Sequence, residues 1–572
     1  MNYNSTRNAA LQVTAAQAIA QGISEEGGLF VPQSFPKADL NDMLGLDYIG
    51  RAEYVLSRFL TDFTPEEIKA CAESAYGGGK FDDNTPAPVV SLDEHGENKH
   101  ILELWHGPTC AFKDMALQIL PHLLTRSLKK TADGKTAVIL VATSGDTGKA
   151  ALEGFKDVAG TEMIVFYPEN GVSPMQKRQM NTQEGENVCV CAIHGNFDDA
   201  QTGVKKIFTD PALKAELARH NKMFSSANSI NWGRLLPQIV YYFSAYLDLV
   251  NAKKIKMGDA INVVVPTGNF GNILASYYAK RMGLPVHKFI CASNSNNVLT
   301  DFIRTGTYDK KRAFYTTISP SMDILVSSNL ERLLYHLCGE DTEKLTGWMN
   351  ALQSGGAYTV DAATADAVRA LFYGGCCDDK ETVEVIRNTF EKDGYLCDTH
   401  TAVAVGVYEQ YLKETGDNTP AVIASTASPY KFPDSVLDAF DCEKPADPFA
   451  EAELLAKLSN TKIPAPITAL RTKPVRFENT CAAADMAARN GQSVKWRCTR
   501  SPICTFPLVQ ISRWMCSAAG KTMWSGWRKT GAPSLPKRIP LSSPGIFPGA
   551  CGWKRPERIS RSSKVCRAKS CC

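Results

Sequence analysis

"TAVILVATSGDTGKAALEGF", residues 136–155, joins a β-branched apolar run to an amphipathic stretch through a short polar loop. The first part is typical of a buried strand and the last part is typical of a helix. Similar apolar runs, most of them followed by helical stretches, recur at 162–168, 261–267 and 421–426. Strands that alternate with helices indicate βαβ units, so we predict an α/β fold with a mostly parallel sheet and helices on both faces. Such sheets bind ligands beyond the carboxyl ends of their strands, which makes the loops after these runs the places to search.

The composition is that of a soluble globular protein. The chain has 572 residues, enough for two to four domains of roughly 100 to 200 residues each. It is 44% hydrophobic and 22% charged, and it holds no run of about 18 uncharged apolar residues that could span a bilayer. The start, "MNYNSTRNAA", lacks the basic and then apolar pattern of a signal peptide, so we expect a cytoplasmic protein with no membrane partner. The 18 cysteines show no zinc spacing, so we expect reduced thiols and no metal.

The two ends of the chain differ from its middle. Residues 1 to about 90 combine helical stretches at 8–23 and 65–76 with Gly and Pro punctuation, which predicts a small, mainly helical N-terminal domain. Residues 486–572 carry 17 Lys or Arg against one acid, Glu557, and hold five of the eight Trp and seven of the 18 Cys. No sustained period of 2 or 3.6 runs through this segment, so we interpret it as an irregular, disordered or non-native tail, such as out-of-frame translation. The alternative is a basic, aromatic nucleic-acid-binding tail, but the excess of Cys and the absence of a module signature favour no nucleic-acid partner.

Two loops after predicted strands could hold an anion. "VATSGDTGKAA", residues 141–151, places Ser144, Asp146 and Thr147 at the start of a helix, where hydroxyl and N–H groups suit a phosphate or a carboxylate. "VVVPTGNFGNILAS", residues 263–276, repeats the arrangement with glycines that permit close approach and asparagines that supply amide donors. For each loop the alternative is a capped or glycine-rich turn with no ligand. Neither loop matches the dinucleotide or ATP-binding glycine motifs, which weakens the case for those ligands.

A single lysine, Lys113, lies between an aromatic ring and an acid in "HGPTCAFKDMALQ", residues 106–118. One such lysine and two anion loops suggest pyridoxal phosphate, because a lysine can form a Schiff base with its aldehyde while a glycine-rich loop holds its phosphate. Burial against Phe112 and near other cations would lower the pKa of this lysine. The alternative is a surface helix lysine paired with an acid one turn away. In "ASTASPYKFP", residues 424–433, the Thr426 hydroxyl could face the pyridine nitrogen, with a plain turn hydroxyl as the alternative.

Six segments, taken together and in this order, are far more specific than any one of them alone. They are "EEGGLFVP" (25–32), "HGPTCAFKD" (106–114), "ATSGDTG" (142–148), "SANSINWGRLLPQ" (226–238), "PTGNFGN" (266–272) and "TASPYKF" (426–432). With them the chain resembles the threonine synthase family, in the long subclass of bacteria and fungi, among the pyridoxal-phosphate enzymes of the tryptophan synthase β fold, also called fold type II. The resemblance runs from Tyr3 to about Asp485.

The resemblance implies two open, mostly parallel-sheet subdomains with the cofactor between them, preceded by a mainly helical N-terminal domain. It divides the chain into an N-terminal domain (1–92), a cofactor-binding catalytic α/β domain (93–485) and the basic tail (486–572). The implied site residues are Lys113 as the lysine that attaches to the cofactor, Gly268, Asn269, Phe270, Gly271 and Asn272 as its phosphate loop, Thr426 at its ring nitrogen, Ser144, Asp146 and Thr147 at the substrate carboxylate, and Lys177, Asn231 and Arg234 at the substrate phosphate. Ser428 stands where many relatives have histidine, so the family's histidine has no counterpart here.

The implied reaction converts O-phospho-L-homoserine and water into L-threonine and phosphate, with pyridoxal 5'-phosphate as the cofactor and the protein a monomer or homodimer. The nearest alternative is another fold-type-II lyase, a serine or threonine dehydratase or a cysteine synthase, which would be expected to carry a different lysine motif and no such N-terminal domain. Two further alternatives are a nucleotide-binding kinase that uses "SGDTGK", residues 144–149, and an amino-acid sensor that binds without turnover.

Overall fold

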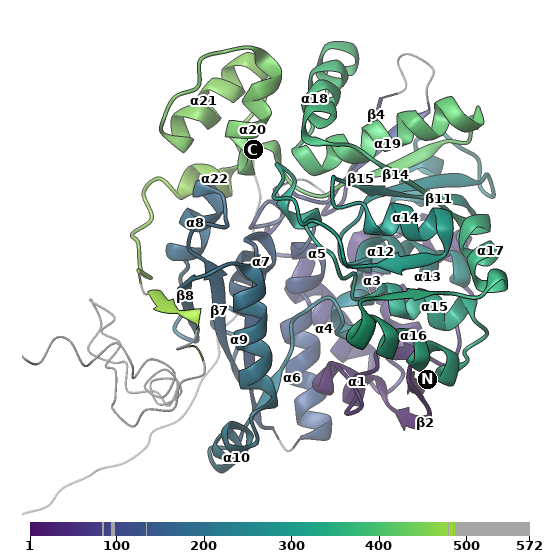
Figure 1. Cartoon of the computed structure of the whole chain (residues 1–572), viewed down its shortest axis with the longest axis vertical. Helices are drawn as coiled ribbons and strands as arrows, with labels where there is room; N and C mark the ends of the chain where they lie inside the picture. The colour runs from purple at the N-terminus through teal and green to yellow at the C-terminus, as the bar shows by residue number, and fades with distance from the viewer. Residues whose placement is uncertain (83–84, 93–97, 133, 479, 484–485, 487–572) are drawn as a thin grey trace, which may run out of the picture. The chain divides into compact units, whose positions relative to one another are not determined.

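The computed structural model describes residues 1–486 except 83–84, 93–97, 133, 479 and 484–485 (Figure 1). The basic segment predicted to be irregular or non-native therefore lies, apart from Met486, outside the described residues. The described residues form an α/β fold with two mostly parallel sheets and a mainly helical N-terminal region, which confirms the predicted fold class. In this part of the chain, no helix combines the length and the apolar character that crossing a membrane requires.

The N-terminal region is mainly helical but begins with a small antiparallel sheet of order β2-β1-β3. The prediction of a helix over 8–23 is wrong for its first part, because Asn8–Val13 forms β2, paired with β1. The helix starts after Thr14, whose hydroxyl accepts a hydrogen bond from the Gln17 N–H in a capping box. The elements are β1 Tyr3–Ser5, β2 Asn8–Val13, α1 Ala15–Gln21, β3 Phe30–Pro32, α2 Leu40–Leu44, α3 Tyr48–Phe59 and α4 Pro65–Tyr76.

The larger sheet has six strands in the order β14-β11-β10-β15-β5-β4. All neighbouring strands are parallel except β4 and β5. The predicted strands at 261–267 and 421–426 are confirmed as β10 and β15, and both are buried along their whole length, which explains their continuous apolar sequences. The strands are β4 Val89–Ser91, β5 Lys99–Glu103, β10 Ile261–Pro266, β11 Val286–Ser293, β14 Phe372–Cys376 and β15 Ala421–Ser425.

The second sheet has five strands in the order β16-β8-β7-β6-β9, all of them parallel. The stretch at 136–155 forms β6 and then α7, as predicted, and the run at 162–168 lies in β7. Figure 1 shows α7, α8 and α9 beside β7 and β8. The elements are β6 Thr136–Ala142, α7 Asp146–Phe155, β7 Thr161–Pro168, α8 Pro174–Asn181, β8 Val188–His194, α9 Phe197–Thr209, α10 Pro211–Arg219, β9 Lys222–Ser225 and β16 Thr480–Ala482.

The remaining helices pack around the sheets, and β12 and β13 form a separate antiparallel pair. These elements are α5 Asp114–Leu117, α6 Leu120–Thr131, α11 Trp232–Leu235, α12 Pro237–Asn251, α13 Gly271–Met282, α14 Val298–Thr305, β12 Thr307–Asp309, η2 Pro320–Met322, α15 Leu330–Leu337, α16 Thr342–Gly355, β13 Ala357–Thr359, α17 Ala362–Leu371, α18 Asp379–Asp393, α19 Thr399–Thr415, η3 Pro429–Lys431, α20 Pro433–Leu437, η4 Asp438–Phe440, α21 Pro448–Ser459 and α22 Ala465–Ala469.

The N-terminal region shares its hydrophobic core with the sheet domains. Helix α12 is buried along most of its length and packs against α3 on one side and α13 on another. Trp232, fully buried, lies with its ring centroid 5.2 Å from that of Tyr3 and 5.6 Å from that of Phe59. Because these rings come from three distant parts of the sequence, the N-terminal region is a packed part of the same body.

Candidate active site

Three loops that follow strand ends meet around one cavity of about 1320 Å³. They are the loops after β6, β10 and β15, which lie at the carboxyl ends of parallel strands, the usual place for a ligand in such sheets. Ten of the residues predicted from the sequence line this cavity: Lys113, Ser144, Thr147, Arg234, Gly268, Asn269, Phe270, Gly271, Asn272 and Thr426. The other three, Asp146, Lys177 and Asn231, are not among the described residues that line it.

Lys113 stands at the start of α5 and is only 8% exposed, so the alternative of a surface helix lysine is excluded. Its Nζ donates a hydrogen bond to Ser321 Oγ at 3.1 Å and lies 3.4 Å from Asp146 Oδ2. Burial lowers the pKa of the Lys113 amine to about 8; Asp146 opposes this shift, whereas the positive charges of Lys431 and Arg234 add to it. A sizeable fraction of this amine is therefore neutral, and able to attack a carbonyl, at mildly alkaline pH.

The acid beside the lysine, Asp114, does not pair with it. The Asp114 carboxylate accepts hydrogen bonds from the Thr109 N–H and from the Thr109 hydroxyl, each at 2.8 Å, and so closes the turn that precedes α5. Burial raises the pKa of Asp114 to about 6. A Cβ on Gly107 would lie 2.6 Å from Asp114 Oδ2, so only glycine allows the chain to pass this close to the carboxylate. The turn thus fixes the backbone that carries Lys113.

The loop between β10 and α13 fits a phosphate group. Phe270 adopts the left-handed conformation, with φ 63°, immediately before the first turn of α13, whose N–H groups have no acceptor within the helix. Asn272 Oδ1 accepts hydrogen bonds from the hydroxyls of Tyr241, at 2.8 Å, and Tyr242. This leaves the buried Nδ2 of Asn272 without a hydrogen-bond partner among the described residues. A buried donor of this kind at a helix N-terminus is suited to an anion that the chain itself does not supply.

The same loop also lies close to η2. A Cβ on Gly268 would meet the carbonyl oxygen of Ser321 at 2.7 Å, so glycine is required by this close approach of two backbones. The Ser327 hydroxyl donates a hydrogen bond to the Gly268 carbonyl at 2.8 Å. Asn329 donates to the Asn269 carbonyl through both its backbone N–H and its side-chain amide, each at 3.1 Å. These contacts hold the loop in a fixed shape beside the cavity.

Thr426 follows the last residue of β15 and is tied to the lysine loop. The Phe112 N–H donates a hydrogen bond to the Thr426 carbonyl at 2.8 Å, next to Lys113 in sequence. The Thr426 residue is 6% exposed and lines the cavity. The fold therefore brings together two distant segments that the sequence analysis singled out.

Asp146 does not fit the direct substrate-carboxylate role that the family resemblance implies. It is buried, and its Oδ1 lies 2.6 Å from Lys431 Nζ and accepts a hydrogen bond from Gln176 at 2.9 Å. Burial alone would raise the pKa of the Asp146 carboxyl, but the charges of Lys431 and Lys113 outweigh it and hold that pKa well below its usual value. A permanent anion would repel a substrate carboxylate, so within this loop Ser144 and Thr147 are the residues placed to contact one.

The three residues predicted to hold a substrate phosphate are placed differently. Arg234 lines the cavity and is buried, which lowers its pKa to about 10, and its Nη1 donates to the Ala227 carbonyl at 2.7 Å. The side-chain amide of Asn231 is hydrogen-bonded to backbone groups. Its Nδ2 donates to two carbonyl oxygens, and its Oδ1 accepts a hydrogen bond from the Gly233 N–H at 2.8 Å. Lys177 lies on α8 and is not among the described residues that line the cavity. Of the three, Arg234 alone lines it.

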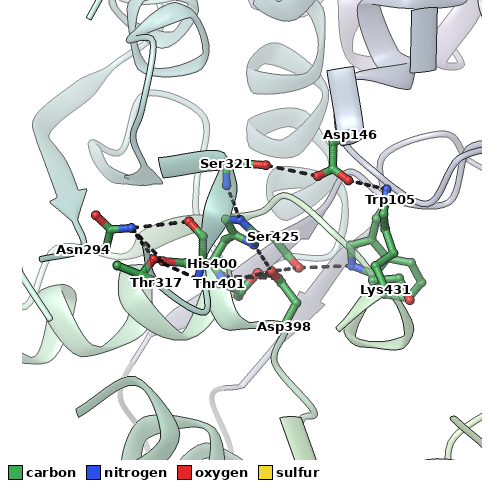
Figure 2. Close-up of polar contacts among 12 residues, drawn as sticks. Trp105, Asp146, Asn294, Thr317, Ser321, Asp398, His400, Thr401, Ser425 and Lys431 are labelled. Carbon is green, nitrogen blue, oxygen red and sulfur yellow. Dashed lines mark hydrogen bonds and ion pairs between the residues drawn. The ribbon is translucent and has the colours of Figure 1, made fainter. Parts of the chain in front are cut away.

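Sequence reasoning missed three residues beside Lys113: Ser321, His400 and Lys431. His400 Nε2 accepts a hydrogen bond from the Ser321 N–H at 3.1 Å, so the proton of the neutral ring is on Nδ1, which donates to Asp398 Oδ1 at 2.8 Å. Figure 2 shows this chain of contacts, with Ser321 between His400 and Asp146 and with Lys431 on the other side of Asp146. Lys431 lies within the segment 424–433 that contains Thr426, but no local sequence pattern distinguishes it from a surface lysine.

Comparison with known proteins places this site in a family. The chain matches family models described as threonine synthase N terminus over residues 2–76, pyridoxal-phosphate dependent enzyme over 81–426 and threonine synthase, C-terminal, over 401–488. It is similar to the threonine synthase of Saccharomyces cerevisiae, with 36% identity over 493 residues, 80% of this chain and 93% of the relative. A crystal structure of a threonine synthase from Brucella melitensis with pyridoxal phosphate bound has a TM-score of 0.74 and 36% identity, covering 84% of this chain and 97% of that one.

A longer group of relatives is also similar. The chain is 40% identical over 487 residues, 82% of its length, to threonine synthase-like 1 of Homo sapiens, of which these residues cover 64%. For the Mus musculus protein of that name the identity is 41% over 468 residues, and the match covers 61% of the relative. The chain thus spans a little over three fifths of the length of these relatives.

Proposed function

The chain belongs to the threonine synthase family of pyridoxal-phosphate dependent enzymes, and from this premise we propose that it converts O-phospho-L-homoserine and water into L-threonine and phosphate. The observation that carries the proposal is Asn272 Nδ2 at the start of α13, a buried donor with no hydrogen-bond partner in the described part of the chain. It lies in the same cavity as Thr426 and as the Lys113 amine, whose pKa is lowered. One cavity thus holds a hydrogen-bond donor for a phosphate, a reactive amine and a hydroxyl. These groups match the phosphate, the aldehyde and the ring nitrogen of pyridoxal 5'-phosphate.

The residues that would hold the cofactor follow from this arrangement. Lys113 would bind its aldehyde carbon, the loop from Gly268 to Asn272 would hold its phosphate, and the Thr426 hydroxyl would face its ring nitrogen. When bound, the cofactor supplies an electron sink that makes protons on the neighbouring substrate carbons acidic. A hydroxyl partner, unlike a carboxylate, leaves the ring nitrogen unprotonated and so moderates that sink.

The protein's own groups would position the substrate and move its protons. Ser144 and Thr147, at the N-terminus of α7, would bind the carboxylate of the amino acid, and the Arg234 guanidinium would bind its phosphate. The neutral Lys113 amine would take a proton from the α carbon and later from the β carbon, because its pKa of about 8 makes it a base near working pH. After phosphate leaves the γ carbon, that carbon would take up a proton, water would add its hydroxyl at the β carbon, and the α carbon would regain a proton. The two protons taken earlier and the one released by water supply the γ carbon, the α carbon and the departing phosphate.

We also propose that residues 1–92 and 93–485 act as N-terminal and catalytic domains of a cytoplasmic enzyme that is a monomer or homodimer. The family-model matches at 2–76 and 81–426 support two such parts, with a boundary between residues 76 and 81, and β4 Val89–Ser91 accordingly belongs to the six-stranded sheet. Analytical ultracentrifugation of the purified chain distinguishes the two oligomeric states.

The test of the function is release of phosphate and threonine from O-phospho-L-homoserine by the purified chain with pyridoxal phosphate. We expect equal amounts of both products, and loss of both in Lys113→Ala. Phosphate without threonine would contradict the water-addition step, and a visible cofactor band with neither product would favour a dehydratase or cysteine synthase. Magnesium-dependent ATP binding without a cofactor band would favour the kinase, and amino-acid binding without turnover would favour the sensor.

A further inference from the structure

A second buried lysine, Lys431, contacts Asp146 (Figure 2), the same carboxylate that Lys113 Nζ approaches to 3.4 Å. Lys431 is fully buried at the end of η3, where its Nζ lies 2.6 Å from Asp146 Oδ1 and donates a hydrogen bond to the Thr109 carbonyl at 3.0 Å. A buried ammonium group is tolerated only where its charge is paired and its N–H groups have acceptors. The two short contacts satisfy that condition for Lys431.

Asp146 is oriented by partners on both of its oxygens. Oδ1 contacts Lys431 and accepts from Gln176, whereas Oδ2 accepts from the Ser321 hydroxyl at 3.2 Å and lies 3.4 Å from Lys113 Nζ. Because both oxygens are engaged, the carboxylate cannot rotate without breaking several contacts. Its Oδ2 is therefore kept next to the Lys113 amine.

Two lysines share this one carboxylate. Lys431 makes the shorter contact with Asp146, at 2.6 Å against 3.4 Å for Lys113. The carboxylate therefore stabilises a positive charge on Lys113 less than it would if Lys431 were absent. Arg234 on α11 is a further cation near Lys113. His400 on α19 contacts the same neighbourhood through Ser321, whose backbone N–H donates a hydrogen bond to His400 Nε2. Lys431 thus adds to the positive surroundings that disfavour a charged Lys113.

We propose that Lys431 is a positioning residue that acts through Asp146 to keep the Lys113 amine neutral and aimed into the cavity. Lys431 is not among the described residues that line the cavity. It acts mainly through the carboxylate that it orients, and its proximity to Lys113 adds to this effect. This inference rests on the proposed function only in so far as Lys113 is the residue that reacts with the cofactor.

The test measures the protonation of Lys113 in the full-length chain, freed of cofactor, without any substrate. Acetic anhydride acylates only neutral amines, so the pH dependence of Lys113 acetylation, followed by mass spectrometry of its peptide, gives its pKa. We compare the parent with Lys431→Met, Lys431→Arg and the control Lys149→Met. Lys149 is a buried lysine on the same helix as Asp146 that pairs with Glu153 at 3.0 Å and does not line the cavity.

In Lys431→Met, Asp146 loses its closer cation and Lys113 loses a neighbouring positive charge, so both changes favour protonation of Lys113. We expect its pKa to rise by about one unit or more, to return toward the parent value in Lys431→Arg, and to stay unchanged in Lys149→Met. An unchanged midpoint in folded Lys431→Met would overturn the inference, as would an equal rise in Lys149→Met. If Lys431→Met does not fold, Asp146→Asn provides the second test, because removal of the carboxylate must lower the Lys113 midpoint; a rise or no change there overturns the inference.

The outcome is separable from that of the proposed function. A shifted Lys113 midpoint in a chain that releases no phosphate from O-phospho-L-homoserine would leave the positioning role standing and the substrate wrong. Normal threonine formation, with the same Lys113 midpoint in the parent and in every Lys431 variant, would leave the proposed function standing and the positioning role wrong. As a second readout, the affinity for pyridoxal phosphate at pH 7, where the neutral amine is the reacting form, is expected to fall about tenfold in Lys431→Met if the pKa of Lys113 rises by one unit.

Discussion

Asn272→Asp tests the role of the phosphate loop separately from the other residues of the site. The substitution keeps an acceptor for the Tyr241 and Tyr242 hydroxyls but removes the buried Nδ2 donor that has no partner among the described residues. Loss of one hydrogen bond to a charged group costs about 1.5 to 3 kcal/mol, and a carboxylate about 4 Å from a phosphate adds roughly 1 kcal/mol even at the dielectric constant of water. The sum, about 3 kcal/mol, corresponds to a Kd for pyridoxal phosphate that is higher by on the order of 100-fold.

The assay titrates the visible absorbance of bound cofactor in the parent and in Asn272→Asp, with pyridoxal phosphate and with pyridoxal. Pyridoxal reacts with the same lysine but lacks the phosphate, so its Kd is expected to be equal in the two chains. Thermal unfolding without ligand verifies that the variant folds. An equal loss of affinity for both ligands would place the effect outside the phosphate contact, and no loss for either would refute the assignment of this loop.

Three further outcomes follow from the structure. Capture of pyridoxal phosphate by the cofactor-free chain needs the neutral Lys113 amine. Its rate, followed by stopped-flow absorbance, is therefore expected to rise about tenfold per pH unit below about pH 8 and to level off above it; a rate that keeps rising about tenfold per unit up to pH 10 would contradict the lowered pKa. Gly107→Ala puts a Cβ 2.6 Å from Asp114 Oδ2 and is expected to lower the free energy of unfolding in urea by about 1 to 3 kcal/mol. The control Gly347→Ala, at a helical site where a Cβ meets nothing within 4 Å, is expected to leave the free energy of unfolding unchanged or to raise it. Equal losses of stability in the two variants would show that the close approach at Gly107 does not explain the cost. Removal of residues 487–572 is expected to leave threonine formation unchanged, because every residue assigned to the site precedes this segment; a folded but inactive truncation would make the segment part of the enzyme.

The strands could be predicted from the sequence where burial on both faces requires a continuous run of apolar residues. Each of the runs that form β6, β7, β10 and β15 is apolar on both faces because helices cover both sides of a parallel sheet, so the pattern is visible without the fold. Strand β2 was not predictable in this way, since most of its residues are exposed and only pairing with β1 keeps it extended. Its alanines favour a helix in isolation, and the tertiary contact overrides that preference.

The residues of the candidate site also fall into two groups, those with a local sequence signal and those without one. Lys113, Thr426 and the loop from Gly268 to Asn272 stand next to strand ends or in distinctive local motifs, so the sequence could identify them. Lys431 and His400 could not be identified, because what makes them unusual is a partner far away in the chain, Asp146 for one and the Ser321 backbone for the other. Asn231 is the opposite case. It lies within a strongly matching segment, yet its amide is fully engaged with backbone groups and its place in the motif has a structural cause.

The charge arrangement around Lys113 also couples the two sheets. Asp146 starts the helix that follows β6 of the five-stranded sheet, whereas Lys431 follows β15 of the six-stranded sheet, so their 2.6 Å contact joins elements of both. The Lys113 amine is set between them by contacts of 3.1 and 3.4 Å to Ser321 and Asp146. Coulomb energies at these separations change steeply with distance inside a protein. A substitution that moves one sheet relative to the other by as little as about 1 Å would therefore alter the protonation of Lys113 even if every residue of the site were retained.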